Sequence, residues 1–273
     1  MIVKDIYLSE KYPEAYMTAY ISYNSPELKN PPRKAMLICP GGGYDFTSDR
    51  EAEPIAKFFI AAGLNCFVLR YSVREKAAGS APIIQSALAI KHIRENAEKY
   101  NIDPNKVFAI GFSAGGHLAA ACGVLWNLPE VTEALGDAPL GIGRPNGMIL
   151  SYPVVSTEKP YTHEGTACNI CGSKDPDDEL RVRYSIDKNI DSTTPPTFIW
   201  HTFDDGCVPL EHSLMLANAL RKNGVPFELH IYPHGVHGLA LATEETASGW
   251  DANINPHVQS WTTLALKWLN ECN

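Results

Sequence analysis

Short apolar runs alternate with longer helical patterns along most of this chain, and that alternation restricts the fold more than any other feature. The predicted strands are residues 15–22, 34–39, 65–71, 106–111, 147–152, 197–201 and 227–232. From residue 34 onward these runs are almost continuously apolar, as in parallel strands that are covered on both faces. The predicted helices, with apolar residues at steps of three and four, are residues 51–62, 83–100, 114–126, 211–223 and 257–270. The pattern predicts an α/β fold built on a doubly wound, mostly parallel sheet.

Residues 156–196 break this alternation, because they are polar and rich in turn-forming residues. In a doubly wound sheet, ligands bind beyond the carboxyl ends of the strands. A long segment inserted there often forms a lid or a substrate-binding cap. We therefore expect a single domain over residues 1–273 with a short cap insertion at 156–196; a plain surface excursion is the alternative.

Charge and cysteine content exclude several other classes of protein. The formal net charge is −8 and the basic residues are scattered, so we expect no nucleic-acid partner. The apolar stretch at residues 58–69 is interrupted by Gly63 and Asn65 and is too short to span a bilayer. Residues 1–9 lack the apolar core of a secretory signal. The seven cysteines are odd in number and widely spaced, as in a reduced, cytoplasmic protein. The sequence leaves a homodimer open.

The most specific motif is Gly111-Phe-Ser113-Ala-Gly115, which fits G-x-S-x-G and lies where a predicted strand meets a predicted helix. A sharp turn there pushes the Ser113 hydroxyl above the sheet edge, and the two glycines remove side chains that would collide with the strand and the helix. The amino end of the helix offers amide donors to a developing anion. Ser113 is therefore the candidate nucleophile, and an incidental serine in a glycine-rich turn is the alternative.

A serine nucleophile needs a histidine base and a carboxylate that orients the histidine, in the chain order Ser, Asp, His. Two loops that follow predicted strands supply candidates in this order. Asp204 and Asp205 follow the strand at 197–201, and His234 and His237 follow the strand at 227–232. The pattern of residues alone leaves both choices open.

Three consecutive glycines, Gly41 to Gly43, follow the strand at 34–39. Glycines let backbone amides converge on one point without side chains in the way, as an oxyanion hole requires. We expect one donor from Ala114, the residue after the nucleophile, and a second from Gly42 or Gly43. A flexible loop or a phosphate cradle is the alternative, but G-x-G-x-x-G and the Lys-Ser/Thr of a phosphate loop are both missing.

These motifs together resemble the α/β-hydrolase superfamily. The matching segments are Pro40-Gly-Gly-Gly-Tyr44, residues 111–117, Asp204-Asp205 before Val208-Pro209, and His234-Gly-Val-His237-Gly. Within the superfamily the chain is most similar, over residues 34–269, to small carbohydrate esterases of the acetyl-xylan-esterase-like group. The resemblance implies the α/β-hydrolase fold, with Asp205 as the acid and His237 as the base. Pro40 stands where the hormone-sensitive-lipase branch has histidine, which separates the chain from that branch.

The activity that this resemblance implies is that of a serine carboxylesterase. It removes short acyl groups, acetyl above all, from O-acetylated carbohydrates such as xylo-oligosaccharides. A lipase or a serine peptidase on the same triad is the alternative, and a catalytically silent binding protein with the hydrolase fold is an alternative of a different class. We expect no cofactor and no metal, since Cys168, Cys171 and His163 have partial zinc spacing without a fourth ligand.

Several further residues are candidates for secondary roles. His117, on the helix after the nucleophile, is typical of a packed helix residue rather than a catalyst. Residues 48–51 either line the pocket or cap the first helix. Tyr44, Tyr152 and Trp200 lie at strand ends, where their rings either stack on a sugar or, for Trp200 in particular, pack in the core.

Overall fold

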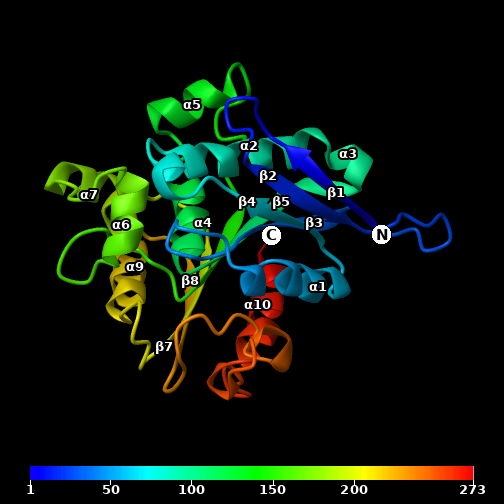
Figure 1. Cartoon of the computed structure of the whole chain (residues 1–273). Helices are drawn as coiled ribbons and strands as arrows, with labels where there is room; N and C mark the ends of the chain where they lie inside the picture. Colours follow the sequence, from blue (N-terminus) through cyan, green and yellow to red (C-terminus); the bar gives the residue numbers. More distant parts are fainter. Residues whose placement is uncertain (273) are drawn as a thin grey trace.

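An eight-stranded sheet organises residues 1–272, which are the residues that this computed structural model describes (Figure 1). Its spatial order is β1-β2-β4-β3-β5-β6-β7-β8. The strands are β1 (Ile2–Tyr7), β2 (Tyr16–Ile21), β3 (Arg33–Cys39), β4 (Asn65–Arg70), β5 (Ile102–Phe112), β6 (Gly147–Ser151), β7 (Thr197–Thr202) and β8 (Phe227–Tyr232). Neighbours from β4 across to β8 pair in parallel, whereas β2 is antiparallel to both β1 and β4. The predicted, mostly parallel sheet is confirmed.

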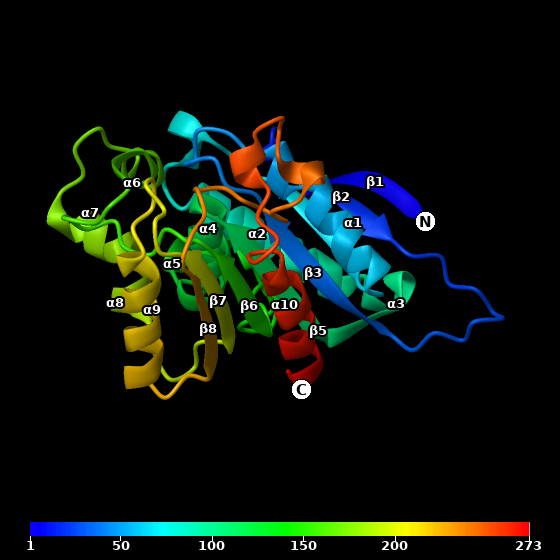
Figure 2. The same ribbon diagram turned by 90° about the horizontal axis from the view of Figure 1, so that it is seen from below.

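Helices cover both faces of this sheet, because successive side chains of a strand point to opposite faces. Ala35 and Leu37 of β3 pack on the face covered by α2 (Ala81–Glu95), α4 (Ala114–Val124) and α9 (Glu211–Lys222). Met36 and Ile38 pack on the face covered by α1 (Glu53–Ala61) and α10 (Ser260–Glu271), which share one side of the sheet in Figures 1 and 2. The sheet is therefore doubly wound. No helix in the described residues has both the length and the apolar composition that a bilayer crossing needs.

Several elements differ from those that the sequence predicts. β1 has mostly exposed side chains at the sheet edge, so no apolar run marks it in the sequence. The single helix predicted over 83–100 is two helices, α2 and α3 (Ala97–Tyr100), which meet at Asn96. A short helix, α5 (Pro129–Leu135), lies outside the predicted set. α10 begins at Ser260 rather than at 257, because the Asn255 side chain orders the preceding turn instead.

Three helices occupy the insertion at residues 156–196, namely α6 (Glu164–Cys171), α7 (Asp178–Tyr184) and α8 (Ile186–Asn189). They lie on the same side of the molecule as α9 (Figure 2). The Asn169 side chain in α6 donates a hydrogen bond to the carbonyl of Gly43, in the loop after β3, at 2.9 Å. The insertion therefore contacts the glycine loop, and its action as a lid stays a prediction.

Two buried histidines attach the insertion to the rest of the protein. Nδ1 of His212, on α9, accepts from the amides of residues 155 and 156, and its Nε2 donates to the carbonyl of Tyr161 at 2.8 Å. His117, on α4, donates from Nε2 to the carbonyl of Tyr184 at 2.7 Å. Burial lowers the pKa of both imidazoles to about 4. Both rings are therefore neutral in the folded protein at pH 7, and His117 is a packed residue.

These two rings make the stability of the fold depend on pH. Below the ordinary histidine pKa of about 6.5, the unfolded chain protonates both rings while the folded chain does not. We expect the free energy of unfolding to fall by about 2–3 kcal/mol per ring between pH 7 and pH 4.5. Urea unfolding at several pH values measures this slope. His212→Gln should remove about half of it, and an unchanged slope in that variant would contradict the assignment.

Candidate active site

The turn between β5 and α4 holds Ser113 at a strained backbone position, with φ 55° and ψ −120°. Close packing on both sides explains the glycines of the motif. A Cβ on Gly111 would lie 1.9 Å from the carbonyl oxygen of Gly115, and a Cβ on Gly115 would lie 2.1 Å from the carbonyl oxygen of Cys39. The motif therefore occupies the strand–turn–helix that the sequence predicts.

Ser113, His237 and Asp205 form one hydrogen-bonded chain. The Ser113 hydroxyl lies 2.9 Å from His237 Nε2, and His237 Nδ1 lies 2.7 Å from Asp205 Oδ2. Because Nδ1 donates to the carboxylate, Nε2 is left to accept the serine proton. The Tyr152 ring meets the imidazole edge to face, with centroids 5.0 Å apart. The structure thus brings together the three residues that the sequence motifs single out.

The Asp205 side chain is buried among hydrogen-bond donors. Its Oδ1 accepts from the amides of Cys207 and Val208, both at 2.9 Å, and its Oδ2 lies 3.4 Å from His201 Nε2. Burial alone would favour the neutral acid, but the donors on His201, His237 and Val208 outweigh it and hold the pKa of Asp205 well below its usual range. The carboxylate therefore stays ionised beside His237. No sequence motif marked the supporting role of His201.

The neighbouring candidates Asp204 and His234 pair with each other at the surface. His234 Nδ1 lies 3.2 Å from Asp204 Oδ2, and the Gly235 amide donates to Asp204 Oδ1 at 2.7 Å. These two hydrogen bonds, that of Gly235 first, lower the pKa of Asp204. The pair connects the loops after β7 and β8 and lies outside the hydrogen-bonded chain of Ser113.

The backbone carbonyls of residues 40–44 all accept hydrogen bonds from other groups, which fixes the glycine loop. The carbonyl of Pro40 accepts from the Tyr71 hydroxyl, that of Gly41 from the Ser48 amide, and that of Gly42 from the Asp45 and Phe46 amides. The carbonyl of Gly43 accepts from the Asn169 side chain, and that of Tyr44 from the Arg74 amide. The amides of Gly42 and Gly43 find no acceptor within residues 1–272, and both glycines line the cavity of Ser113. Ala114 begins α4, where an amide has no partner inside the helix. These three amides can therefore donate to a ligand oxygen.

A buried carboxylate, that of Glu51, connects three loops of the site. Its Oε2 accepts from the Gly41 amide and its Oε1 accepts from the Tyr152 hydroxyl, each at 2.7 Å. The Tyr152 hydroxyl in turn accepts from the amide of Ala240 at 3.0 Å, three residues after His237. One carboxylate therefore positions the glycine loop and, through Tyr152, the ring and the segment that support His237.

The cavity around Ser113 has a volume of about 620 Å³ and is lined by polar side chains, glycines, two cysteines and Phe46. Ser48, Arg50 and Glu51 line it, so the pocket-lining alternative for residues 48–51 holds for these three, whereas Asp49 lines a separate cavity. Within the described part of the chain, Phe46 is the one residue of this lining with a hydrocarbon side chain. Polar groups of a ligand therefore find partners here, beside the apolar surface of the lining.

His163 brings a further donor to this cavity from the insertion. Its Nδ1 accepts from the Thr166 amide at 3.2 Å, at the start of α6, which leaves the proton of a neutral ring on Nε2. Burial, and then the charge of His237, lowers the pKa of His163. The nearby Cys168 Sγ donates to the carbonyl of Lys174. Across residues 1–272, no three His, Cys, Asp or Glu side chains are grouped to hold a metal ion.

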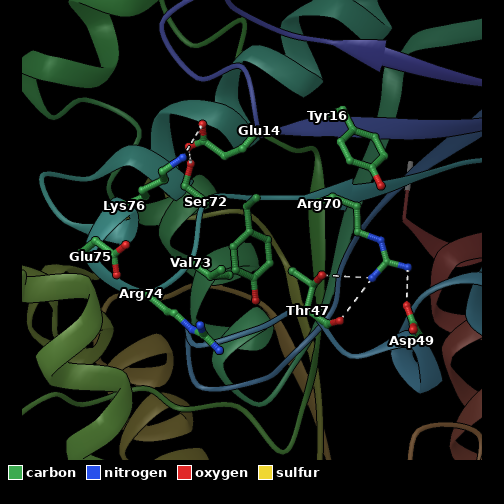
Figure 3. A pocket seen from close by; sticks show the side chains of 11 residues that line it. Glu14, Tyr16, Thr47, Asp49, Arg70, Ser72, Val73, Arg74, Glu75 and Lys76 are labelled. Carbon is green, nitrogen blue, oxygen red and sulfur yellow. Dashed lines mark hydrogen bonds and ion pairs between the residues drawn. The ribbon is translucent and has the colours of Figure 1, made fainter.

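The loop at residues 45–51 contributes to this cavity and to a second one of about 600 Å³. Thr47 and Asp49 line the second cavity, and the other five residues of the loop line the first. The second cavity is rich in charged side chains, and two ion pairs join four of them (Figure 3). Arg70 lies 2.7 Å from Asp49, and Lys76 lies 3.3 Å from Glu14. These pairs stabilise the back of the glycine loop and leave the cavity around Ser113 as the candidate active site.

Tyr44, Tyr152 and Trp200 are all buried, so the hypothesis that they stack on a sugar is wrong. The loops that follow the central strands cover these strand ends, and the rings pack inward. Trp200 stacks on Trp261 at 5.2 Å between centroids, and its Nε1 donates to the hydroxyl of Ser151 at 2.7 Å. The packed alternative therefore holds for Trp200.

We expect Glu51→Gln and Tyr152→Phe each to slow the labelling of Ser113 by a fluorophosphonate about ten-fold. Each change removes a charge-assisted hydrogen bond, which is worth about 1.5–3 kcal/mol. The effect of the double variant should be smaller than the product of the two single effects, because both changes break the Glu51–Tyr152 hydrogen bond. Urea unfolding of each variant is the control. Variants that unfold more easily but label at the wild-type rate would leave Glu51 with a structural role alone.

Two family models match the chain in succession. The BD-FAE model matches residues 22–140, and the model of the prolyl oligopeptidase family matches residues 146–252. Endo-1,4-beta-xylanase B of Butyrivibrio fibrisolvens is 39% identical over 226 residues, which are 80% of this chain and 34% of that protein. The chain thus spans about a third of the length of this curated relative.

Two solved structures are similar over nearly their whole length. MGS-M1, an α/β-hydrolase enzyme from a Medee basin deep-sea metagenome library, is 36% identical with a TM-score of 0.82, and the match covers 100% of this chain and 98% of that one. The acetyl ester-xyloside bifunctional hydrolase of Caldicellulosiruptor lactoaceticus is 35% identical with a TM-score of 0.82, over 98% of this chain and 96% of that one. The similarity covers nearly all of both chains, and this chain has a mostly parallel sheet and a strained serine turn. The chain therefore belongs to the α/β-hydrolase family.

Proposed function

We propose that this chain is a serine carboxylesterase in which Ser113 is the nucleophile, His237 the general base and acid, and Asp205 the carboxylate that orients His237. The hydrogen-bonded chain from the Ser113 hydroxyl to Asp205 carries the proposal. It supplies a proton acceptor for the serine and an ionised partner for the imidazolium that forms when the serine attacks.

The geometry supports acyl transfer in two steps. His237 Nε2 takes the hydroxyl proton as Ser113 Oγ bonds to the ester carbonyl carbon. The amides of Gly42 or Gly43 and of Ala114 donate to the oxyanion, and one such donor is worth about 3 kcal/mol of barrier. The carbon–oxygen bond to the alcohol then breaks, and the alcohol receives the proton from His237. Water attacks the acyl-serine by the same route and releases the carboxylic acid.

Short acyl esters of a carbohydrate suit the walls of the cavity. Phe46 is the one hydrocarbon side chain of this lining within the described residues and offers a contact for a short acyl group, and esters of longer acyl chains test the lipase alternative. Arg50, at the edge of the cavity beside His237, offers a charged group that suits sugar hydroxyls. The name of one solved relative, an acetyl ester-xyloside bifunctional hydrolase, supports acetylated xylo-oligosaccharides as the substrate class.

A serine peptidase is the second candidate, because the prolyl oligopeptidase model matches residues 146–252. That match contains Asp205 and His237 and excludes Ser113 and the glycine loop. A panel of acetylated xylo-oligosaccharides, 4-nitrophenyl esters of increasing chain length and a prolyl 4-nitroanilide ranks the esterase, the lipase and the peptidase against one another. We expect kcat/KM to be highest for the acetyl esters.

Ser113→Ala should abolish both the hydrolysis of 4-nitrophenyl acetate and covalent labelling by a fluorophosphonate, because it removes the attacking oxygen. Circular dichroism checks that the variant is folded. If the wild-type protein neither turns over the ester nor labels at Ser113, the chain is a silent binding protein with this fold and the proposal is wrong.

Asp205→Asn should lower kcat by about 10⁴-fold, because an amide no longer holds the histidine in the productive tautomer. Asp204→Asn is the matched control, one residue away in the surface pair with His234, and should stay within about two-fold of the wild type. Steady-state kinetics on 4-nitrophenyl acetate compare the two. The opposite ranking would assign the acid to Asp204.

A further inference from the structure

A second opening of the site begins at His237 and ends at an exposed tryptophan. This groove, which we name the Trp250 groove, has a volume of about 640 Å³. It shares Arg50, Cys207 and His237 with the cavity around Ser113. Its other walls come from the loop after β7, from the residue before His237, and from residues 248–253. Cavity and groove therefore form one cleft with His237 at the junction.

Trp250 is fixed by its backbone, while its side chain is exposed. Its amide donates to the carbonyl of Ala247 at 3.0 Å, and its carbonyl accepts from the Asn253 amide at 2.9 Å. The two residues before it, Ser248 and Gly249, form a left-handed turn with φ of 55° and 75°. The residue is 69% exposed, although the turn that carries it is well held. An apolar ring in this position can bury its face against a ligand and gain free energy by doing so.

The chemistry of the triad decides which part of an ester points into this groove. The oxyanion faces the amides of Gly42 and Gly43, inside the cavity of Ser113. The leaving oxygen must lie within hydrogen-bond reach of His237 Nε2, which protonates it. The alcohol attached to that oxygen therefore continues past His237, and the groove that opens there leads to Trp250.

The rim of the groove carries polar groups beside the indole. Arg50 donates from Nε to the carbonyl of Thr246 and from Nη2 to that of Gly238, and its Nη1 makes no hydrogen bond within residues 1–272. Asp204 presents a half-exposed carboxylate on the same rim. A flat apolar ring flanked by a guanidinium and a carboxylate matches a pyranose or furanose ring, which has an apolar C–H face and hydroxyl groups at its edge.

We propose that the Trp250 groove binds the alcohol part of the substrate, a glycosyl unit whose C–H face packs on the Trp250 ring. The inference rests on the proposed function of Ser113 as an esterase nucleophile. It gives Trp250 a role in substrate specificity, since the residue contacts the sugar and leaves the reacting atoms to the triad.

The test compares leaving groups of different reach. Trp250→Ala should raise KM for an acetylated xylotriose about ten-fold, since the sugar loses an apolar partner. The kinetics on ethyl acetate, whose alcohol is too short to reach the groove, should stay at the wild-type level. Trp250→Phe, which keeps a flat ring, should restore most of the affinity for the oligosaccharide. Tyr23→Ala removes a ring that is 68% exposed at a distant loop and should leave both substrates unaffected.

Two results would overturn the inference. Equal KM values for wild type and Trp250→Ala on the oligosaccharide would show that the groove does not hold the sugar. A change in the preference between ethyl acetate and ethyl butyrate would show that the groove takes the acyl group instead.

A binding measurement separates this inference from the proposed function. Unesterified xylotriose, titrated into the Ser113→Ala variant, should change the tryptophan fluorescence, and the change should vanish when Trp250→Phe is added. If the wild type hydrolyses ethyl acetate but this signal is missing, the sugar subsite is wrong and the esterase stands. If the signal is present but no ester is turned over, the esterase is wrong and the sugar site stands.

Discussion

The tight packing of the serine turn is the constraint on which the rest of the site depends. β5 lies between β3 and β6, so its carboxyl end has neighbours on both sides. Ser113 is held there by its amide, which donates to the carbonyl of Ser151, and by its carbonyl, which accepts from the amides of His117 and Val154. A non-glycine residue in such a conformation costs about 1–3 kcal/mol, which the surrounding hydrogen bonds and packing must offset. The side chains of His237 and Asp205 therefore have to be positioned relative to Ser113.

Burial of the segment that follows His237 holds this histidine beside Ser113. The segment after His237 has left-handed φ values at Gly238, Ala240 and Ala242, and both alanines are buried on the α1/α10 face of the sheet. The indole of Trp261 donates to the carbonyl of Ala240 at 3.0 Å, and the Tyr152 hydroxyl accepts from the amide of the same residue. The hydrophobic core and the Glu51–Tyr152 pair therefore both position His237. A change in core packing under this segment would therefore shift His237.

The features of this protein that could be predicted from the sequence are those with local physical causes. Strand and helix periods identified the doubly wound sheet, and the glycines around Ser113 marked a turn that admits no other residue. These patterns missed β1, whose edge position leaves no apolar run. The sequence also did not identify Trp250 as an exposed ring beside the site. Tyr44, Tyr152 and Trp200 were instead candidates for stacking on a sugar, because they stand at strand ends. Whether a strand-end ring is covered depends on loops that fold over it from distant parts of the chain, and no local pattern encodes that.

By itself, the sequence determined the fold class and the serine turn, because each depends on residue patterns within short stretches. The choice of Asp205 and His237 as candidate partners of Ser113 came from the resemblance to a family. Only the tertiary structure decided that Asp204 and His234 pair apart from the site, that Glu51 bridges the glycine loop and Tyr152, and that His163 and Asn169 reach the cavity from the insertion. These contacts join residues that lie tens to more than a hundred positions apart. They exist because the carboxyl ends of parallel strands meet at one edge of the sheet, where loops that are remote in sequence become neighbours.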